Sequence, residues 1–436
     1  MNEPYVSVGI LSGKSIKFSL SGIYSTDDVR VVAGEQIVTL SDSGMSILWN
    51  GSLYSSIEFR PTSYDGDTFE LNDVVIGVDF HWQRAEKQRF KGVLRFIVSN
   101  GRLTAINSIK VEDYLVSVIS SEMSPDSSLP FLRAHAIISR SWLLAQIKHD
   151  KRPGRDTFRN DNKEIIRWWD HEDHSDYDVC ADDHCQRYQG VQRIKGSVAS
   201  GAVEDTSGMV LMADGMLCDT RFSKCCGGVF EEFESCWDDE HHSYLIARRD
   251  NINSDRFPDL TDESEARKWI LSKPKSFCDT SDDQILSQVL NSYDRERKDF
   301  YRWTEIISQE KLVTLLRERS NINVGNIINM IPVQRGTSGR IVRLHIIGTK
   351  GDIVIGKELM IRRTLSESHL LSSAFVVEKN FSDSEEIPSS FTLHGAGWGH
   401  GVGLCQIGAA VMGEKGYTYD EILRHYYPGA SIVKLY

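Results

Sequence analysis

The sequence lacks any apolar run of the roughly 20 residues that a membrane-spanning helix needs. Its start, Met1-Asn2-Glu3-Pro4, has no basic stretch followed by an apolar one, so no signal peptide is visible. Lysine and arginine (50 residues) are outnumbered by aspartate and glutamate (62), which gives a net charge of −12. This deficit argues against a duplex nucleic-acid binder, which needs a basic face, and remains compatible with a neutral or mildly anionic substrate.

The patterns along the 436 residues predict an α+β fold with two or three domains. Residues 1 to about 110 alternate between apolar and polar residues, and Asn100-Gly101 between two apolar runs is a strong hairpin signal. We therefore expect a β-rich N-terminal module at residues 1–100 and one larger domain of mixed strands and helices at residues 101–436.

Helical spacing of apolar residues predicts a helix at residues 127–149 that is buried nearly all round. The following residues, 150–190, are polar and read as a long loop. Residues 250–300 form a charged insertion with helical stretches at Glu263 to Leu271 and Asp283 to Tyr293. The chain ends, at residues 391–436, in a glycine-rich loop, two helices and a strand.

Glu122 is the candidate acid. It stands in Ser121-Glu122-Met123, with apolar neighbours, directly before the predicted buried helix. Partial desolvation of a carboxyl there would favour its protonated form, which a general acid requires. The alternative is a structural glutamate that caps the helix or pairs with an arginine such as Arg140.

Histidines and cysteines gather in the polar segment before residue 190. The best metal-ligand set is His174, Cys180, His184 and Cys185, with His171 as a spare. Two imidazoles and two thiolates would fill the four positions of a structural zinc, which would fold the loop rather than activate water. The alternatives are a Cys180–Cys185 disulfide and unpaired surface residues.

Five more cysteines form a second group: Cys218, Cys225, Cys226, Cys236 and Cys278. The chain around Ser223 to Gly228 can turn tightly and present backbone amides. One interpretation is a substrate-facing loop braced by disulfides, with at least one bridge among the first four cysteines. The others are a set of buried free thiols and a catalytic cysteine.

The segment His394 to Gly403 carries glycine at alternate positions, which lets a backbone approach a ligand or another strand closely. The spacing of a dinucleotide-binding loop is missing, so phosphate binding is not expected. Trp398 offers a flat apolar face for a sugar ring, or it belongs to the core. His400 and Gln406 offer hydrogen bonds.

These motifs occur together in one family, and the chain resembles the stage II sporulation protein D and LytB amidase-enhancer family (SpoIID/LytB). The resemblance covers roughly residues 100–436, with insertions, and leaves the N-terminal β region unmatched. The matching segments are Val111 to Tyr114, Ser121 to Met123, Leu132 to Arg140, Tyr177 to Cys180, His184 to Gln186, Tyr188 to Gly190, Ser223 to Gly228, Arg335 to Arg340, Gly397 to Gly403, Gln406 to Ala409 and His425 to Gly429.

The resemblance implies a lytic transglycosylase located in the cell envelope, acting on peptidoglycan glycan strands stripped of their stem peptides. It implies that Glu122 is the catalytic acid and that the His and Cys loop is a zinc site. Candidate glycan-binding residues are Arg140, Ser223, Gly227, Gly228, Trp398, His400 and Gln406. Two departures from the family pattern leave Glu122 intact: Cys225-Cys226 and Cys405 stand where many members have serines.

Two other functions stay open. The chain could bind glycan without cutting it and enhance a cell-wall amidase, as the resemblance also implies. It could instead be a zinc protein unrelated to the wall, and glycan binding would discriminate between these readings.

Overall fold

The structure is a computed structural model that describes residues 2–28, 30–77, 83–124, 126–148, 158–161, 163–168, 174–182, 184–193, 198–253, 256–290, 298–382 and 386–436. Helices make up 25% and strands 38% of the described residues, in mixed sheets, which confirms the predicted α+β class. The chain divides into two compact units, each described by itself. Unit 1 comprises Met1–His149, His174–Val210 and Ile432–Tyr436, and unit 2 comprises Asp150–Asp173 and Leu211–Ser431.

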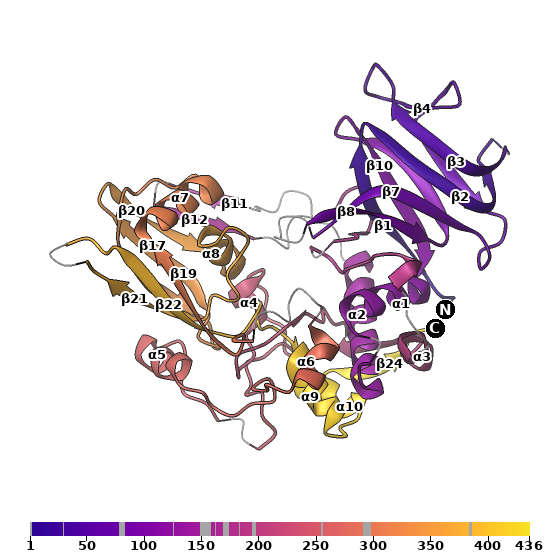
Figure 1. Ribbon diagram of the computed structural model, residues 1–436. Helices are drawn as coiled ribbons and strands as arrows, with labels where there is room; N and C mark the ends of the chain where they lie inside the picture. The colour runs from indigo at the N-terminus through magenta and orange to yellow at the C-terminus, as the bar shows by residue number, and fades with distance from the viewer. Residues whose placement is uncertain are drawn as a thin grey trace. The chain divides into compact units, whose positions relative to one another are not determined.

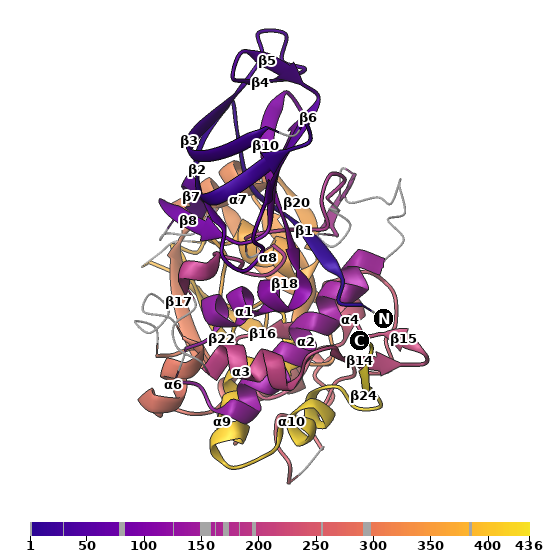
Figure 2. The same cartoon turned by 90° about the vertical axis from the view of Figure 1, so that its right-hand side faces the viewer.

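Unit 1 is built on one large sheet, with strand order β13-β1-β10-β9-β6-β2-β3-β4-β5 and β7 joining β2 to β8. Figures 1 and 2 show β4 at the end of this sheet away from the helices of the same unit. The strands are β1 (Tyr5–Gly13), β2 (Ser15–Thr26), β3 (Val31–Leu40), β4 (Ile47–Trp49), β5 (Ser52–Tyr54), β6 (Ser56–Pro61), β7 (Thr68–Ile76), β8 (Arg84–Phe90), β9 (Val93–Ser99), β10 (Arg102–Lys110) and β13 (Val179–Cys180).

Alternation along these strands places aromatic side chains on one face. Phe18, Phe59 and Phe96 are buried and meet at ring-centroid distances of 5.1 to 6.1 Å. The predicted turn is also confirmed: Asn100 and Gly101 join β9 to β10 with φ of 50° and 69°, the positive values that a tight two-residue hairpin needs.

The helices of unit 1 are α1 (Val111–Glu122), α2 (Leu129–Lys148) and α3 (Val198–Asp205), with a short 3-10 turn η2 (Val191–Arg193). The three α-helices pack against one another (Figure 1). Between Phe131 and Leu144 every side chain of α2 except Arg133 is buried. The helix predicted at residues 127–149 is therefore confirmed, including its burial on nearly all faces.

A buried ion pair joins α1 to α2. The guanidinium of Arg140, 0% exposed, donates to Glu112 from Nε (2.9 Å) and from a terminal nitrogen (2.6 Å), and to the carbonyls of Met209 and Val203. Glu112 also accepts from the hydroxyl of Tyr436 at 2.6 Å. These bonds satisfy both charged groups, so the loss of one partner would leave the other charge uncompensated.

Unit 2 contains a five-stranded sheet, β11-β12-β20-β19-β18, and a three-stranded sheet, β17-β22-β21. A buried cluster that includes Leu312, Leu344, Ile361 and Phe391 joins strands of both sheets to helices α7 and α8. The strands are β11 (Phe158–Asn160), β12 (Glu164–Arg167), β15 (Met216–Leu217), β16 (Phe222–Ser223), β17 (Arg302–Ser308), β18 (Ile327–Arg335), β19 (Ile341–Gly348), β20 (Gly351–Gly356), β21 (Phe375–Asn380), β22 (Ser390–Ala396) and β23 (Leu404–Cys405).

The helices of unit 2 follow their sequence signals closely. Ser308 caps α7 by accepting from the Lys311 amide, and Asn321 ends it in the left-handed conformation. The helices are α4 (Phe233–Cys236), α5 (Glu263–Leu271), α6 (Asp283–Val289), α7 (Gln309–Ser320), α8 (Glu358–Thr364), α9 (Gln406–Glu414) and α10 (Tyr419–Tyr426). Strands β14 (Met209–Ala213) and β24 (Ser431–Lys434) lie where the chain passes from one unit to the other.

The structure differs from the sequence expectation in residues 150–190 and divides the chain into units at other positions. Residues 150–190 are not one loop, because they contain β11, β12 and β13, and β12 pairs with β20. The domain boundary expected at residues 100 and 101 stays a prediction, and the two compact units divide the chain elsewhere. Among the described residues, no helix is both long and apolar enough to span a bilayer.

The Arg140–Glu112 pair predicts a large loss of stability on truncation. Arg140→Ala leaves Glu112 without its cation, so the free energy of unfolding should fall by about 3–5 kcal/mol in urea titrations. Arg133→Ala, on the same helix, breaks a pair with Asp205 whose side chains are 31% and 47% exposed, and should cost about 1 kcal/mol or less. Equal losses in the two variants would contradict the structural role assigned to Arg140.

Candidate functional site

Glu122 is the last residue of α1, and it leaves the helix as the chain turns into an extended Met123. The buried face of α1, including Val118 and Ile119, anchors this end of the helix, and Met123 is also buried. Glu122 itself is partly exposed. The carboxyl therefore stands at the end of a rigid element, not directly before a helix as the sequence suggested, and solvent can reach it.

One hydrogen bond orients this carboxyl. The backbone N–H of Arg187 donates to Oε1 of Glu122 at 3.4 Å. The donor belongs to a segment that is pinned to the helices, since the Gln186 side chain bridges the Tyr114 hydroxyl (3.3 Å) and the carbonyl of Ser139 (3.3 Å). Among the described residues, no other hydrogen bond reaches Glu122, and Oε2 faces no protein donor.

Stacked tyrosines hold the same segment. The rings of Tyr114 and Tyr188 lie 5.0 Å apart at 22°, and the Tyr188 hydroxyl donates to Asn107 at 2.6 Å. Burial raises the pKa of Tyr114 well above its ordinary value, and the nearby Cys185 and Cys180 add to this. Both phenols therefore stay neutral near pH 7 and act as packing and hydrogen-bonding groups.

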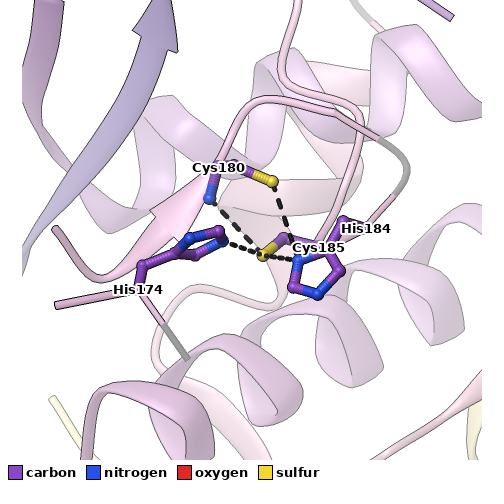
Figure 3. Close-up of side chains that lie close together, drawn as sticks. All are labelled: His174, Cys180, His184 and Cys185. Carbon is purple, nitrogen blue, oxygen red and sulfur yellow. Dashed lines mark hydrogen bonds between the residues drawn. The ribbon is translucent and has the colours of Figure 1, made fainter. Parts of the chain in front are cut away.

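The predicted metal ligands come together next to this segment. One ligand atom from each of His174, Cys180, His184 and Cys185 lies within 4.8 Å of every other (Figure 3). The Cys185 sulfur is 3.5 Å from His174 Nε2 and 3.5 Å from His184 Nδ1, and the Cys180 sulfur is 3.9 Å from His184 Nδ1. Tetrahedral zinc separates sulfur and nitrogen ligands by about 3.5 Å, so the residues fit such an ion.

The cluster is mounted on the edge of the large sheet. Strand β13 pairs in parallel with β1, so Cys180 stands opposite Gly9. Tyr177 packs over Gly9, where a Cβ would overlap the phenol ring, and its ring centroid lies 4.7 Å from that of His174. Glycine at position 9 is therefore what lets this segment lie flat on the strand.

The cluster also favours the thiolate form. A hydrogen bond from Cys185, followed by those of His174 and His184, lowers the pKa of Cys180 despite its burial. Both cysteines are free thiols, so the alternative of a Cys180–Cys185 disulfide is not formed. The spare ligand, His171, lies outside the described residues.

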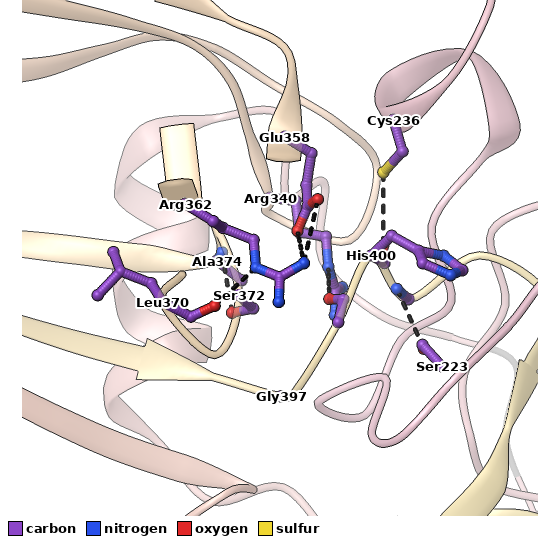
Figure 4. Close-up of polar contacts among 12 residues, drawn as sticks. Ser223, Cys236, Arg340, Glu358, Arg362, Leu370, Ser372, Ala374, Gly397 and His400 are labelled. Atoms are coloured by element: carbon purple, nitrogen blue, oxygen red, sulfur yellow. Dashed lines mark hydrogen bonds and ion pairs between the residues drawn. The ribbon is translucent and has the colours of Figure 1, made fainter. Parts of the chain in front are cut away.

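The glycine-rich loop of unit 2 is pinned by its backbone. Trp398 and Cys225 exchange two backbone hydrogen bonds of 2.7 and 2.9 Å, and the Gly401 amide donates to the Ser223 hydroxyl at 3.2 Å (Figure 4). Arg340, 0% exposed, lies beneath the loop and donates to the carbonyls of Gly399 (3.1 Å) and Cys226 (3.2 Å). The loop is thus a supported structural element.

His400 is held by the same loop. Its Nε2 donates to the carbonyl of Phe222 at 2.9 Å, and its Nδ1 accepts from the Val402 amide at 3.1 Å, an assignment that follows from the partners. Burial, followed by Arg221 and Arg340, lowers the pKa of His400 well below its ordinary value. The ring is therefore uncharged, and both of its nitrogens form hydrogen bonds within the protein.

The predicted substrate-binding residues therefore differ in how accessible their side chains are to a ligand. Arg140 is corrected to a structural residue, because its guanidinium is buried and bonded to Glu112. His400 has no free ring nitrogen, and Ser223 and Gln406 are 7% and 2% exposed. Trp398 is partly exposed and packs against the core of unit 2, while its role as a sugar platform stays a prediction.

Gly227 and Gly228 have φ of 79° and 106°, and the Gly227 carbonyl accepts from Arg302 at 3.1 Å. The candidates are also divided between the units: Glu122, Arg140 and the His and Cys cluster belong to unit 1, and the others to unit 2.

Two features escaped the sequence analysis. The Arg187 amide beside Glu122 is a backbone group and carries no side-chain signal. Arg340 stands in a segment that the family resemblance already singled out, but nothing in the sequence indicates that its side chain lies under the glycines. The predicted bridge among Cys218, Cys225, Cys226 and Cys236 is wrong for this structure, where all four are buried free thiols.

Comparison with known proteins supports the resemblance. Residues 99–212 match the family described as stage II sporulation protein, and residues 231–403 match a domain of unknown function (DUF8618). The amidase enhancer of Bacillus subtilis is 27% identical over 53% of this chain, but the match spans only 32% of that relative. The stage II sporulation protein D of Bacillus amyloliquefaciens is 22% identical over 75% of both chains.

A further relative, an uncharacterized protein of Brachyspira hyodysenteriae, is 25% identical over 94% of this chain and 85% of its own length. This match includes the N-terminal strands that the motifs left unassigned. The predicted resemblance to the SpoIID/LytB family is confirmed.

Alanine substitutions at two glycines should lower the free energy of unfolding by different amounts. Gly401 and Gly416 both have positive φ, 77° and 84°, but only at Gly401 would a Cβ overlap another group, the guanidinium of Arg340. The backbone strain costs an L-residue about 1–2 kcal/mol, and overpacking adds about 1–3 kcal/mol. Urea titration should therefore show a loss of about 1–2 kcal/mol for Gly416→Ala and about 2–5 kcal/mol for Gly401→Ala. Similar losses at both positions would refute the close packing of Arg340 against the loop.

Proposed function

We propose that this member of the SpoIID/LytB family is a lytic transglycosylase that cleaves peptidoglycan glycan strands in the cell envelope. The observation that carries the proposal is Glu122: a partly exposed carboxyl at a helix end, with Oε1 bound by the Arg187 amide and no hydrogen bond to Oε2 from the part of the chain that the structure describes. The relatives named amidase enhancer and stage II sporulation protein D support a role connected with the cell wall.

A single acid suffices when the substrate supplies its own nucleophile. Glu122 donates its proton to the glycosidic oxygen between N-acetylmuramic acid and N-acetylglucosamine, and the bond to the anomeric carbon breaks. The resulting carboxylate takes the proton of the C6 hydroxyl of N-acetylmuramic acid, and that oxygen bonds to the anomeric carbon. The product is a 1,6-anhydro ring, no water is consumed, and Glu122 is again protonated.

Two physical effects would raise the reaction rate. Acid–base help from one positioned carboxyl gives about 10²–10⁴-fold in rate. An attacking hydroxyl held on the same sugar reacts at an effective molarity of up to about 10⁵–10⁸ M when correctly oriented. The Arg187 amide, which donates to Oε1 at 3.4 Å, orients the Glu122 carboxyl for both proton transfers.

The His174, Cys180, His184 and Cys185 cluster is proposed as a structural zinc site. Four protein ligands leave no open coordination position, so the ion would take no part in the reaction. The position of Cys185 in the chain indicates what the zinc ion would do. Cys185 directly precedes Gln186, which is hydrogen bonded to α1 and α2, and Arg187, whose amide donates to the Glu122 carboxyl. Zinc would therefore hold the donor that orients Glu122.

The second candidate function is enhancement of a cell-wall amidase by glycan binding without cleavage. The relative named amidase enhancer favours it. Under this reading the chain would sediment with insoluble peptidoglycan, release no soluble product and accelerate cleavage by an added amidase. In either function we propose that Trp398, whose side chain is partly exposed, contacts the glycan from the glycine-rich loop of unit 2.

Incubation with denuded glycan strands should release products with 1,6-anhydro ends, detected by mass spectrometry. Glu122→Gln should lower the rate by about 10²–10⁴-fold because the amide cannot donate and recover a proton. Glu204→Gln, an exposed glutamate on α3, is the matched control and should keep the full rate. Products with hydrolytic reducing ends, or an active Glu122→Gln variant, would refute the mechanism.

Removal of a metal ligand should loosen the segment that holds the Arg187 amide against the Glu122 carboxyl. Cys185→Ser should lower the zinc content by one ion per chain and reduce the rate of anhydro-product release, while Glu122 remains in place. Cys218→Ser, a buried thiol outside the cluster, should change neither quantity. Full activity in a Cys185→Ser protein that has lost the ion would show that zinc does not support the carboxyl.

A further inference from the structure

Unit 2 contains a second cluster of ligand-type side chains. Cys226, Asp250, Cys278 and Cys405 each place one ligand atom within 4.8 Å of all the others. The four residues come from separate segments: the turn after β16, the loop after Arg249, the turn before α6 and the N-cap of α9. None is more than 2% exposed.

The sulfur spacing fits an ion and not a covalent bridge. Cys226 and Cys278 sulfurs are 3.6 Å apart. A disulfide requires about 2.05 Å, whereas two sulfurs bound to one tetrahedral zinc at about 2.3 Å each lie about 3.8 Å apart. All of the cysteines involved are free thiols.

Backbone amides point at the sulfurs. The Cys226 amide donates to the Cys405 sulfur at 3.3 Å, and the Gly228 amide donates to the Cys226 sulfur at 3.4 Å. Such bonds stabilise negative charge on sulfur, as the second shell of a thiolate metal site does.

Asp250 has the geometry of the fourth ligand. Its Oδ1 accepts from the Tyr426 hydroxyl (3.0 Å) and lies 3.4 Å from His425 Nε2, while its Oδ2 accepts from the Cys278 amide (3.0 Å) on the side of the sulfurs. A carboxylate oxygen has two lone-pair sites, so Oδ2 keeps one available. Gly408 leaves room for this arrangement, because a Cβ there would overlap the Tyr426 hydroxyl and approach Oδ2 to 2.9 Å.

We propose that Cys226, Cys278, Cys405 and Oδ2 of Asp250 bind one structural zinc ion in unit 2. Three thiolates select zinc over magnesium or calcium, and four protein ligands leave no open position. The ion would link the Cys225-Cys226 turn, which pairs with Trp398, to the start of α9. This site goes beyond the proposed function and does not depend on it.

Metal content measured on the full chain, purified under reducing conditions, tests the proposal. The unmodified protein should carry two zinc ions, Cys405→Ser one, Cys185→Ser one and the double variant none. Cys218→Ser, which removes a buried thiol outside both clusters, should keep two. Because each cluster has its own variant, loss or failure of the His174 site is distinguished from failure of this one.

Cobalt substitution in the Cys185→Ser protein gives a second readout that does not need the Cys405 variant to fold. We expect tetrahedral d–d bands and a sulfur-to-cobalt charge-transfer band with the intensity of three thiolates. Asp250→Asn should alter the d–d bands and keep the charge-transfer intensity, whereas Cys225→Ser should change neither.

The proposal is overturned by a Cys405→Ser protein that keeps all its zinc, by a native Cys226–Cys278 disulfide in non-reducing peptide mapping, or by bound iron in place of zinc. Loss of the ion in Cys225→Ser with retention in Asp250→Asn would overturn the ligand set.

Discussion

The buried pair between Arg140 and Glu112 is the constraint on which the geometry of the candidate site depends. It fixes α1 against α2 in the interior of unit 1, and it also receives the Gly208 amide and the Tyr436 hydroxyl. A shift of α1 along α2 would separate Glu112 from Arg140 and leave both charges unpaired. The pair therefore holds α1 in place, including its last residue, Glu122. A charged pair in the core thus positions the group proposed to move protons.

In each unit, side chains of metal-ligand type from loop segments lie close together. In unit 1, His174, Cys180, His184 and Cys185 lie at the edge of the large sheet, next in the chain to Gln186 and the Arg187 amide. In unit 2, sulfur and carboxylate groups collect beneath the Cys225-Cys226 turn, which is hydrogen bonded to Trp398. A zinc ion at each proposed site would link these segments by coordination bonds in addition to their packing.

The glycine-rich loop illustrates how a motif that resembles a ligand cradle serves internal packing. Gly401 admits the guanidinium of Arg340, and Gly399 supplies it with a carbonyl. The neutral His400 ring bridges Phe222 and Val402. The side chain of Trp398 remains partly exposed above this support. The rigidity of the loop, rather than its side chains alone, is what a sugar-binding role would use.

Local patterns in the sequence determined the α+β class, the Asn100-Gly101 hairpin, the buried helix at α2 and helices α5, α6, α9 and α10 of unit 2, because each depends on spacing and capping among neighbours. The four residues of the His174 cluster were also identifiable, since they lie within a dozen positions. Only the tertiary structure decided that Arg140 pairs with Glu112 and not Glu122, and that the Arg187 amide meets the carboxyl. It likewise brought Asp250 to Cys226, Cys278 and Cys405. Those contacts join residues 24 to 179 positions apart, and side-chain type carries no information about which distant partner the fold will bring near.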